Sequence, residues 1–250
     1  MLKKTFLVLC LLIFTYPLVG QDMNKYRNIN WRIYHQLNFS DYIDINSAEW
    51  KSISQKEKKE LMQIPENELK TMSTKELIEA YINCAYTRSF FLFSEIDEYY
   101  KHLYQGFNGV NELINRRDAV DEITKYYIAM NPQDNAVSTA GIQMPFQIQF
   151  IEYLIGSPEI VKKIDSEKLH LIVSELVKKY QIKTQIQSAL TETLESNIYA
   201  ISRLLDRSDT GKQNELTMVV GITTLHKTGR IPNDKISYQI INLANEFIEK

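Results

Sequence analysis

Residues 73–127 decide the fold of this chain, and they read STKELIEAYINCAYTRSFFLFSEIDEYYKHLYQGFNGVNELINRRDAVDEITKYY. The stretch opens with Ser73 and, three residues later, Glu76. This is the spacing of a capping box, in which each side chain binds the backbone N–H group of the other residue. Apolar residues then recur with the period of an α-helix. The stretch therefore predicts a helix that begins at Ser73 and ends near Ala85.

Helical periodicity continues on both sides of this stretch. A charged helix is expected before Pro65, then a short helical turn, and a later helix is expected to end at the glycines of Gly106-Phe107-Asn108-Gly109. Towards the C-terminus, continuous apolar faces predict further helices. The expected ranges are 54–64, 66–72, 95–104, 145–155, 165–180, 190–205, 216–229 and 236–248.

These segments predict an all-α fold. Glycine and proline number only 8 and 6, whereas all-β folds and nucleotide-binding α/β folds need glycine in their turns and phosphate loops. Two arrangements fit equally well. One is a superhelical array of antiparallel helix pairs, of the HEAT or armadillo type, and the other is a closed multi-helix bundle.

A helix junction is predicted at Arg116-Arg117-Asp118. Positive charge in the last turn of a helix complements the free carbonyl groups there. The Asp118 carboxylate is expected to cap the next helix by accepting from its first N–H groups. The tripeptide is therefore predicted to be structural and not part of an active site.

The first twenty residues have the three regions of a secretory signal peptide. Lys3 and Lys4 form a basic start, residues 6–14 form a short apolar run, and the chain becomes polar after Gly20. The apolar run is shorter than the ~20 residues that span a membrane. The sequence predicts cleavage after Gly20, hence an exported protein, periplasmic or secreted, with no membrane span after cleavage. The alternative is an uncleaved anchor.

Residues 21–250 are expected to form a single all-helical domain. Residues 21–48 have weak periodicity and fit both a short helix and an extended arm. Turn residues cluster over 131–141, where the helical period is lost. That segment is the candidate for an internal boundary.

Charge and cysteine content limit the partners and the covalent chemistry. Loss of Lys3 and Lys4 with the signal peptide takes the formal net charge from −2 to −4. A mildly acidic protein has no bulk attraction for nucleic acid. Cys84 is then the single remaining cysteine, so no internal disulfide is expected. Its place on the apolar side of a predicted helix favours a buried thiol.

No established catalytic or metal-binding motif occurs in the sequence. The four histidines, at positions 35, 102, 170 and 226, lack the spacing that places two ligands on one helical face. Phosphate-binding glycine loops and the G-x-S-x-G nucleophile motif do not occur either. The sequence therefore predicts no catalytic, cofactor-binding or metal-binding residue, and it favours a protein that is not an enzyme and has no cofactor.

Three tyrosines are the candidates for partner binding: Tyr99, Tyr100 and Tyr104. Exposed tyrosines are enriched at binding hot spots, where they stack on peptide side chains or sugar rings. Adjacent helical positions are not expected to point fully inward together, so Tyr99 and Tyr100 are candidates for contact with a protein, peptide or glycan. The alternative, which we favour, is that these rings belong to a core that joins two helical layers.

Three segments carry a resemblance to a group of known proteins. They are residues 72–77 (MSTKEL), 106–109 (GFNG) and 113–119 (LINRRDA). Over roughly residues 71–127 the chain resembles exported, uncharacterised all-helical proteins of Bacteroides-type bacteria. In that group a proline follows the first helix, where this chain has Cys84-Ala85-Tyr86. The resemblance implies an exported helical domain. It implies no activity, and it assigns no functional residue.

Two functions are compatible with these patterns. The first is a non-catalytic binding or scaffold domain of the cell envelope that uses a groove between amphipathic helices. The alternative is an exported hydrolase whose site is assembled from scattered acidic or histidine residues. Convergent ionisable groups with shifted pKa values in a deep pocket would favour the hydrolase, and a shallow apolar groove would favour binding.

Overall fold

The computed structural model describes residues 51–52, 54–133, 145–186 and 191–249, and this part of the chain is all-α, as predicted. No strand occurs in these ranges. The expected signal peptide, the segment 21–48 and residues 134–141 of the expected boundary lie outside the described residues.

The helices before residue 133 begin largely where the sequence predicts. Ser54 and Ser73 each form a capping box with the glutamate three residues later, as expected for Ser73 and Glu76. Gly106 ends one helix, and the next begins two residues later. The elements are α6 (Gln55–Leu61), α7 (Glu66–Thr71), α8 (Thr74–Asn83), α9 (Ala85–Arg88), η1 (Ser89–Leu92), α10 (Ile96–Gly106), α11 (Asn108–Asn115) and α12 (Ala119–Ala129).

The helices of the second half also follow the predicted ranges, with one exception. Asp165 starts the longest of them, because its carboxylate accepts a hydrogen bond of 2.8 Å from the Lys168 backbone N–H. The elements are α13 (Pro145–Ile155), α14 (Pro158–Val161), α15 (Ser166–Thr184), α16 (Thr191–Leu205), η3 (Ser208–Thr210), α17 (Gln213–Thr217), α18 (Ile222–Thr228) and α19 (Asp234–Ile248).

The exception is the single helix predicted over 216–229, which is wrong. The structure has two short helices there, α17 and α18, separated by residues 218–221. Gly221 has a φ of 97°, a left-handed conformation that ends the helical path. Val220, expected on the apolar face, is therefore 77% exposed.

The predicted junction at Arg116-Arg117-Asp118 joins α11 and α12, but the predicted cap is wrong. The Asp118 side chain makes no capping hydrogen bond to α12. Its carboxylate instead accepts from the hydroxyl of Thr74 at 2.7 Å, because the buried Thr74 of α8 lies beside the junction. Asp118 therefore connects two helices that are distant in sequence.

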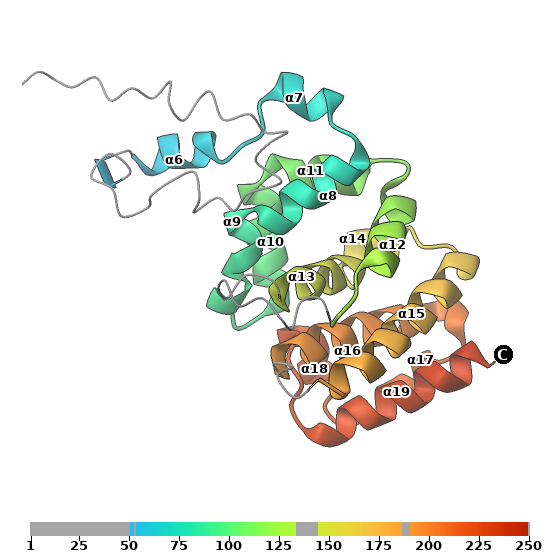
Figure 1. The fold of residues 1–250 in the computed structure, drawn as a ribbon. Helices are drawn as coiled ribbons and strands as arrows, with labels where there is room; N and C mark the ends of the chain where they lie inside the picture. The colour runs from blue at the N-terminus through green and yellow to red at the C-terminus, as the bar shows by residue number, and fades with distance from the viewer. Residues whose placement is uncertain (1–50, 53, 134–144, 187–190, 250) are drawn as a thin grey trace, which may run out of the picture.

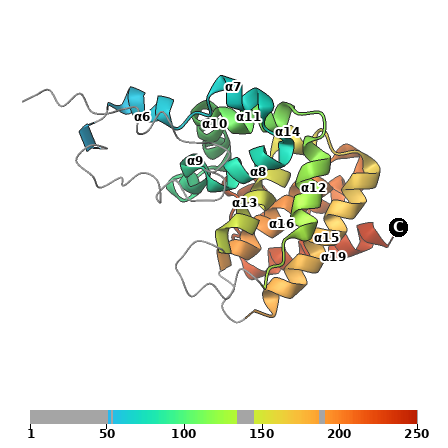
Figure 2. The ribbon, with the colours of Figure 1, turned by 45° about the horizontal axis from the view of Figure 1, so that its top comes forward.

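Helix α13 lies at the centre of the molecule. Figures 1 and 2 both place it between α8 and α16, and it contacts α8, α12, α14 and α16. Every residue of its last eight positions, 148–155, is buried. A helix that is buried on all sides is typical of the core of a protein, and the helices that cover α13 come from both halves of the chain.

The remaining helices are arranged in layers around α13. Helices α8 and α11 form one side, α15 packs against α16, and α19 covers both α15 and α16 (Figure 1). The layers follow chain order, as in an array, while α10 also contacts α18 and so joins an early and a late element, as in a bundle.

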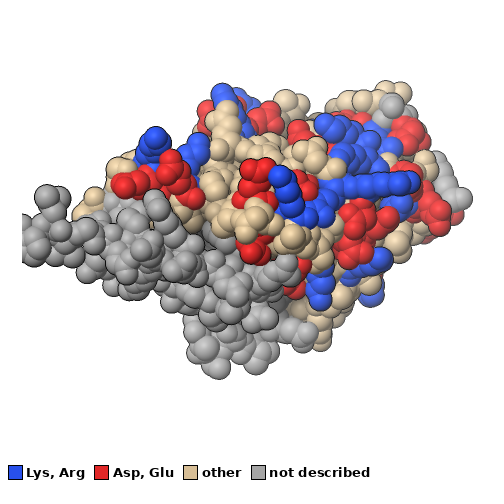
Figure 3. Space-filling view, turned by 90° about the horizontal axis from the view of Figure 1, so that it is seen from above, with Lys and Arg blue, Asp and Glu red and all other residues tan. Residues whose placement is uncertain are grey.

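The surface carries both signs of charge close together. On the face shown in Figure 3, basic and acidic side chains are interspersed. Among the described residues, no helix is both long enough and apolar enough to cross a membrane.

Candidate functional site

The structure places two of the three candidate tyrosines inside the core. Tyr99 and Tyr100 are 0% and 4% exposed, so the core alternative describes them. Both point inward because α10 is covered on two sides. The Tyr99 hydroxyl donates to the backbone oxygen of Thr87, and the Tyr100 hydroxyl donates to that of Tyr153 in α13, at 2.7 Å. In this arrangement neither ring presents a face to solvent.

Tyr104 is the candidate nearest the surface, and it is partly buried. Its hydroxyl donates to the carboxylate of Glu159, in α14, at 2.8 Å. Its ring stacks on that of Tyr100, with centroids 6.0 Å apart and an interplanar angle of 12°. Tyr104 therefore has partners within the protein for both its ring and its hydroxyl.

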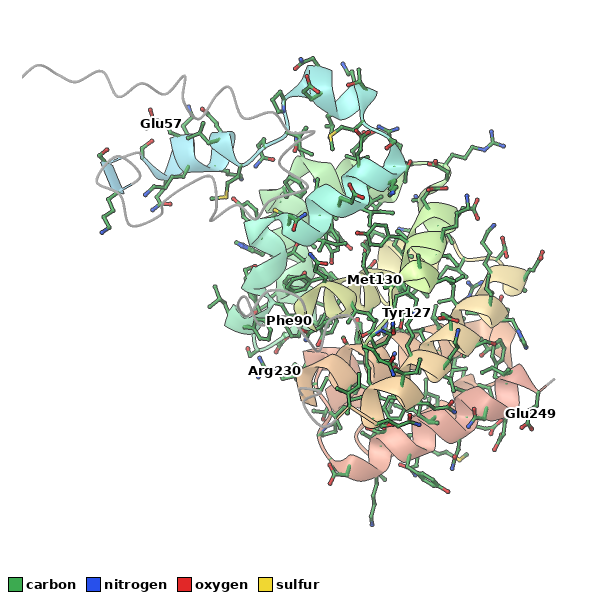
Figure 4. The ribbon with its side chains drawn as sticks, in the orientation of Figure 1. Glu57, Phe90, Tyr127, Met130, Arg230 and Glu249 are labelled. Atoms are coloured by element: carbon green, nitrogen blue, oxygen red, sulfur yellow. The ribbon has the colours of Figure 1, made fainter. Side chains whose placement is uncertain are left out.

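Buried tyrosines surround α13 and hydrogen-bond to its backbone. The Tyr81 hydroxyl donates to the Phe150 oxygen at 2.9 Å, in addition to the Tyr100 contact with Tyr153. Phe90, labelled in Figure 4, stacks on the Tyr153 ring at 4.2 Å. Burial raises the pKa of Tyr81, Tyr100 and Tyr153 well above the usual value, so all three stay neutral hydroxyl donors.

A cluster of polar side chains lies in the core beside these rings, and its centre is Glu152 of α13. The Glu152 carboxylate is 0% exposed. Lys183 of α15 donates to both of its oxygens, at 2.6 and 2.8 Å. The other donors are the hydroxyls of Tyr127 (2.8 Å) and Ser196 (2.6 Å) and the amide of Asn197 (3.1 Å).

The donors to Glu152 come from three different helices. Tyr127 lies near the C-terminal end of α12, facing the interior (Figure 4), while Lys183 is on α15 and Ser196 and Asn197 are on α16. The Asn197 amide also donates to the Leu176 backbone oxygen at 3.1 Å. A buried charge is tolerated only when it is paired and hydrogen-bonded, and here the partners of the Glu152 carboxylate link all three helices to α13.

A second lysine of α15 holds the end of α12. The Lys179 ammonium donates to the backbone oxygens of Ile128 and Met130, and it lies 5.1 Å from the centroid of the Tyr127 ring. Burial lowers the pKa of Lys183, and the neighbouring charge of Lys179 lowers it further, while Glu152 raises it. Glu152 is thus the counter-ion that allows Lys183 to be buried.

The chemistry available to the Glu152 cluster is limited because its members are buried and already hydrogen-bonded to one another. Both Glu152 oxygens already accept hydrogen bonds, and the carboxylate, the lysine and the serine are all buried. A general base or nucleophile must reach its substrate, and here neighbouring side chains occupy that space. The cluster was not predicted from the sequence, although a lone carboxylate in the apolar helix FQIQFIEYLI is a signal that a buried partner must exist.

A second group brings together the residue types of a hydrolytic triad. His226 of α18 has its Nε2 atom 3.2 Å from Ser202 Oγ of α16. Its Nδ1 atom lies 3.9 Å from Asp206 Oδ2. The sequence did not predict this grouping, because the three residues are neither adjacent nor in a known motif.

The hydrogen-bond directions in this group are opposite to those of a triad. A nucleophilic serine donates its proton to the histidine, but the Ser202 hydroxyl donates to the Tyr199 backbone oxygen at 2.7 Å. Ser202 is 0% exposed, and 3.9 Å is too long for a hydrogen bond between His226 and Asp206. The geometry therefore describes a contact between α16 and α18 and not an activated nucleophile.

Metal binding and similarity to known proteins give no further site. Among the described residues, no group of three or more His, Cys, Asp or Glu side chains could hold a metal ion. Cys84 is buried, as expected from its position, and forms no disulfide with another described residue. No protein-family model, curated protein or solved structure matches this chain.

Proposed function

We propose that the protein is an exported, non-catalytic binding or scaffold domain of the cell envelope. The observation that carries the proposal is the complete burial of Glu152 and Ser202, at 0% exposure each. Glu152 and Ser202 belong to the two groups of side chains in the described part of the chain that most resemble catalytic sites. In both groups the reactive atoms are used to hold helices together.

Exposed apolar side chains support a role in binding a partner. Met218 and Val220, between α17 and α18, are 79% and 77% exposed, and Tyr238 of α19 is 70% exposed. Aromatic and apolar side chains of this kind supply contact area at interfaces. A protein, a peptide or a glycan is the class of ligand that we propose.

Capture of a partner from an envelope extract tests the binding role. Met218→Ser and Val220→Ser remove apolar contact area without touching the core. Leu92→Ser is the matched control, since Leu92 is 83% exposed and lies in η1. Saturable binding that weakens in the first two variants supports binding at this surface, and binding unaffected by all three places it elsewhere. The lack of any saturable partner or glycan ligand would contradict the proposal.

The hydrolase alternative rests on one specific observation, the Ser202–His226–Asp206 group. A fluorophosphonate probe, which labels activated serines, distinguishes the two functions. We expect no labelling of the full chain. Labelling that disappears in Ser202→Ala would establish an activated serine and overturn the non-catalytic proposal.

Export is tested separately, on the processed protein. Because residues 1–20 have the order of a signal peptide, we expect the mature chain to begin at Gln21. N-terminal sequencing of protein recovered from outside the inner membrane measures this directly. A chain that retains residues 6–14 would contradict it.

A further inference from the structure

Helix α18 is a short element with a left-handed glycine at each end. It spans only seven residues, Ile222–Thr228. Gly221 precedes it and Gly229 follows it, both with left-handed φ values, 97° and 69°. Left-handed glycines allow the chain to change direction at low cost. The helix is thus connected to its neighbours through two permissive backbone positions.

Both apolar and polar side chains attach α18 to the rest of the molecule. Leu225 and Ile222 are 0% and 8% exposed and supply the apolar contact. His226 supplies the polar contact with α16 through Ser202. Since the Ser202 hydroxyl donates to the Tyr199 oxygen, Ser202 Oγ accepts from His226. This assigns the neutral tautomer with its proton on Nε2.

We propose that α18 is a pH-sensitive clasp, which is closed on α16 while His226 is neutral and opens when His226 takes up a proton. The charged groups near His226 are Arg203 of α16 and Asp206, which directly follows α16. On the α10 side, Glu95 pairs with Lys227 at 2.8 Å. From α13, the Tyr153 hydroxyl donates to the Gly229 oxygen.

The environment of His226 opposes its protonation in the closed state. Burial and, secondly, the Arg203 charge lower the pKa of His226 to about 4. The buried Nε atom of Arg203 has no hydrogen-bond partner in the part of the chain that the structure describes. Protonation of His226 would therefore place a second cation beside a guanidinium that is only partly compensated.

Asp206 is the one charged neighbour that favours protonated His226, and its effect is weak. Its side chain is 34% exposed and 3.9 Å from Nδ1, so solvent screens the attraction. Burial also raises the pKa of Asp206. The carboxylate therefore becomes neutral more readily in acid, where a charge would be needed to stabilise the imidazolium.

The direction of the pH effect follows from proton linkage. An open α18 exposes His226, whose pKa then returns to about 6.5. Below that value the open state binds a proton that the closed state does not, so acid favours opening. With a closed-state pKa of about 4, the opening constant rises on the order of 100-fold between about pH 7 and about pH 4.5.

Amide hydrogen exchange of the full chain, corrected for the intrinsic pH dependence of exchange, measures the opening of α18. We expect the protection of residues 222–228 to fall by that factor at the lower pH, while α13 keeps its protection. His226→Gln, whose amide can still donate to Ser202, should remove the pH dependence. His170→Gln is the matched control, because His170 joins α15 to the end of α19 through the Ile248 oxygen.

Two results would overturn the clasp. One is unchanged protection of α18 in acid, together with a His226 pKa near 6.5 by NMR titration. The other is acid opening that persists in His226→Gln. If that variant does not fold, Arg203→Gln decides the matter, because loss of the guanidinium should weaken the pH dependence of opening. An unaltered pH dependence in Arg203→Gln would contradict the mechanism.

Discussion

Glu152 illustrates how much one buried residue can organise. Its carboxylate receives hydrogen bonds from Tyr127, Lys183, Ser196 and Asn197, which lie on three helices. A buried ion pair contributes little net stability compared with an apolar pair of the same size, but loss of one partner is expensive. We therefore expect the main effect of Glu152 to be on how α12, α15 and α16 dock on α13.

Removal of Lys183 alone should be strongly destabilising. Lys183→Met leaves the Glu152 charge in the core without its counter-ion, and we expect a loss of about 3–5 kcal/mol in the free energy of unfolding. The double variant Glu152→Gln/Lys183→Met should lose much less than the two single variants together. Urea denaturation measures all three. Lys178→Met on the same helix is the control, since Lys178 is 65% exposed and should change stability by less than about 0.5 kcal/mol.

Asp118 should act through Thr74 and not as a helix cap. Asp118→Ala leaves the buried Thr74 hydroxyl without its acceptor, which costs about 1–3 kcal/mol. Asp118→Asn keeps an acceptor oxygen and should be milder. Thr74→Val/Asp118→Ala removes both partners, so its cost should be below that of Asp118→Ala alone. A double variant that is additive in thermal or urea unfolding would show that the two residues are not coupled.

At the scale of single elements, α18 depends on its flanking glycines. A Cβ atom at Gly221 would lie 2.7 Å from Pro232 Cγ, and one at Gly229 would lie 2.8 Å from Ile96 Cδ1. Gly211 is also left-handed, with a φ of 68°, but has nothing within 4 Å of that position. At all three positions a residue with a side chain would be strained by the left-handed backbone. The positions differ in whether its Cβ atom would also clash with a neighbour.

Alanine substitution at these positions should separate the two effects. Gly211→Ala should cost only the left-handed strain, about 1–2 kcal/mol. Gly221→Ala and Gly229→Ala should cost more, because Pro232 or Ile96 must also move. Unfolding midpoints of the three variants measure the difference. Equal losses at all three sites would mean that the neighbours relax freely.

Helix starts were predictable from the sequence because they are local. The Ser73 capping box needs only residues three positions apart, and it forms as expected. The predicted range of α15 likewise starts at Asp165, the residue that caps this helix in the structure. The break between α17 and α18 was not predicted, since the apolar spacing continues through Val220 and only the left-handed Gly221 interrupts it.

Contacts between distant elements were not predictable in the same way. The Glu152 group joins residues from 127 to 197, and nothing in the local pattern links them. It was assumed from the sequence that Tyr99 and Tyr100 cannot both be buried. They are both buried because α10 is covered on two sides. Thr74 is likewise 44 residues from Asp118, so the local sequence could not predict that Thr74 would be the partner of the Asp118 carboxylate.

At the scale of the whole molecule, buried tyrosines should control stability in alkali. Six tyrosine side chains in the core have a raised pKa, and burial is the first cause for each: Tyr81, Tyr99, Tyr100, Tyr127, Tyr153 and Tyr199. For Tyr199 the pKa is about 12. An unfolded chain would ionise all six near pH 10.

The free energy of unfolding should therefore fall steeply above about pH 10. The folded pKa values lie above the unfolded ones, so this contribution to stability is complete below the unfolded pKa and is lost as the pH rises through the folded values. Urea unfolding at increasing pH measures the loss, and tyrosinate absorbance should report the core tyrosines only as the protein unfolds. Ionisation of these tyrosines in a chain that keeps its helical circular dichroism would contradict the expectation.

The central position of α13 has a consequence for the order in which the chain is made. A ribosome that has released residues 51–133 has produced α8 and α12 without α13, the helix that both of them contact. Even when α13 has emerged, its other face stays uncovered until α16 follows. The apolar faces of α8 and α12 that α13 covers in the folded protein therefore lack this cover until α13 has been made. This arrangement of helices favours a chaperone that binds the unfolded chain until synthesis is complete. It disfavours stepwise folding during translation.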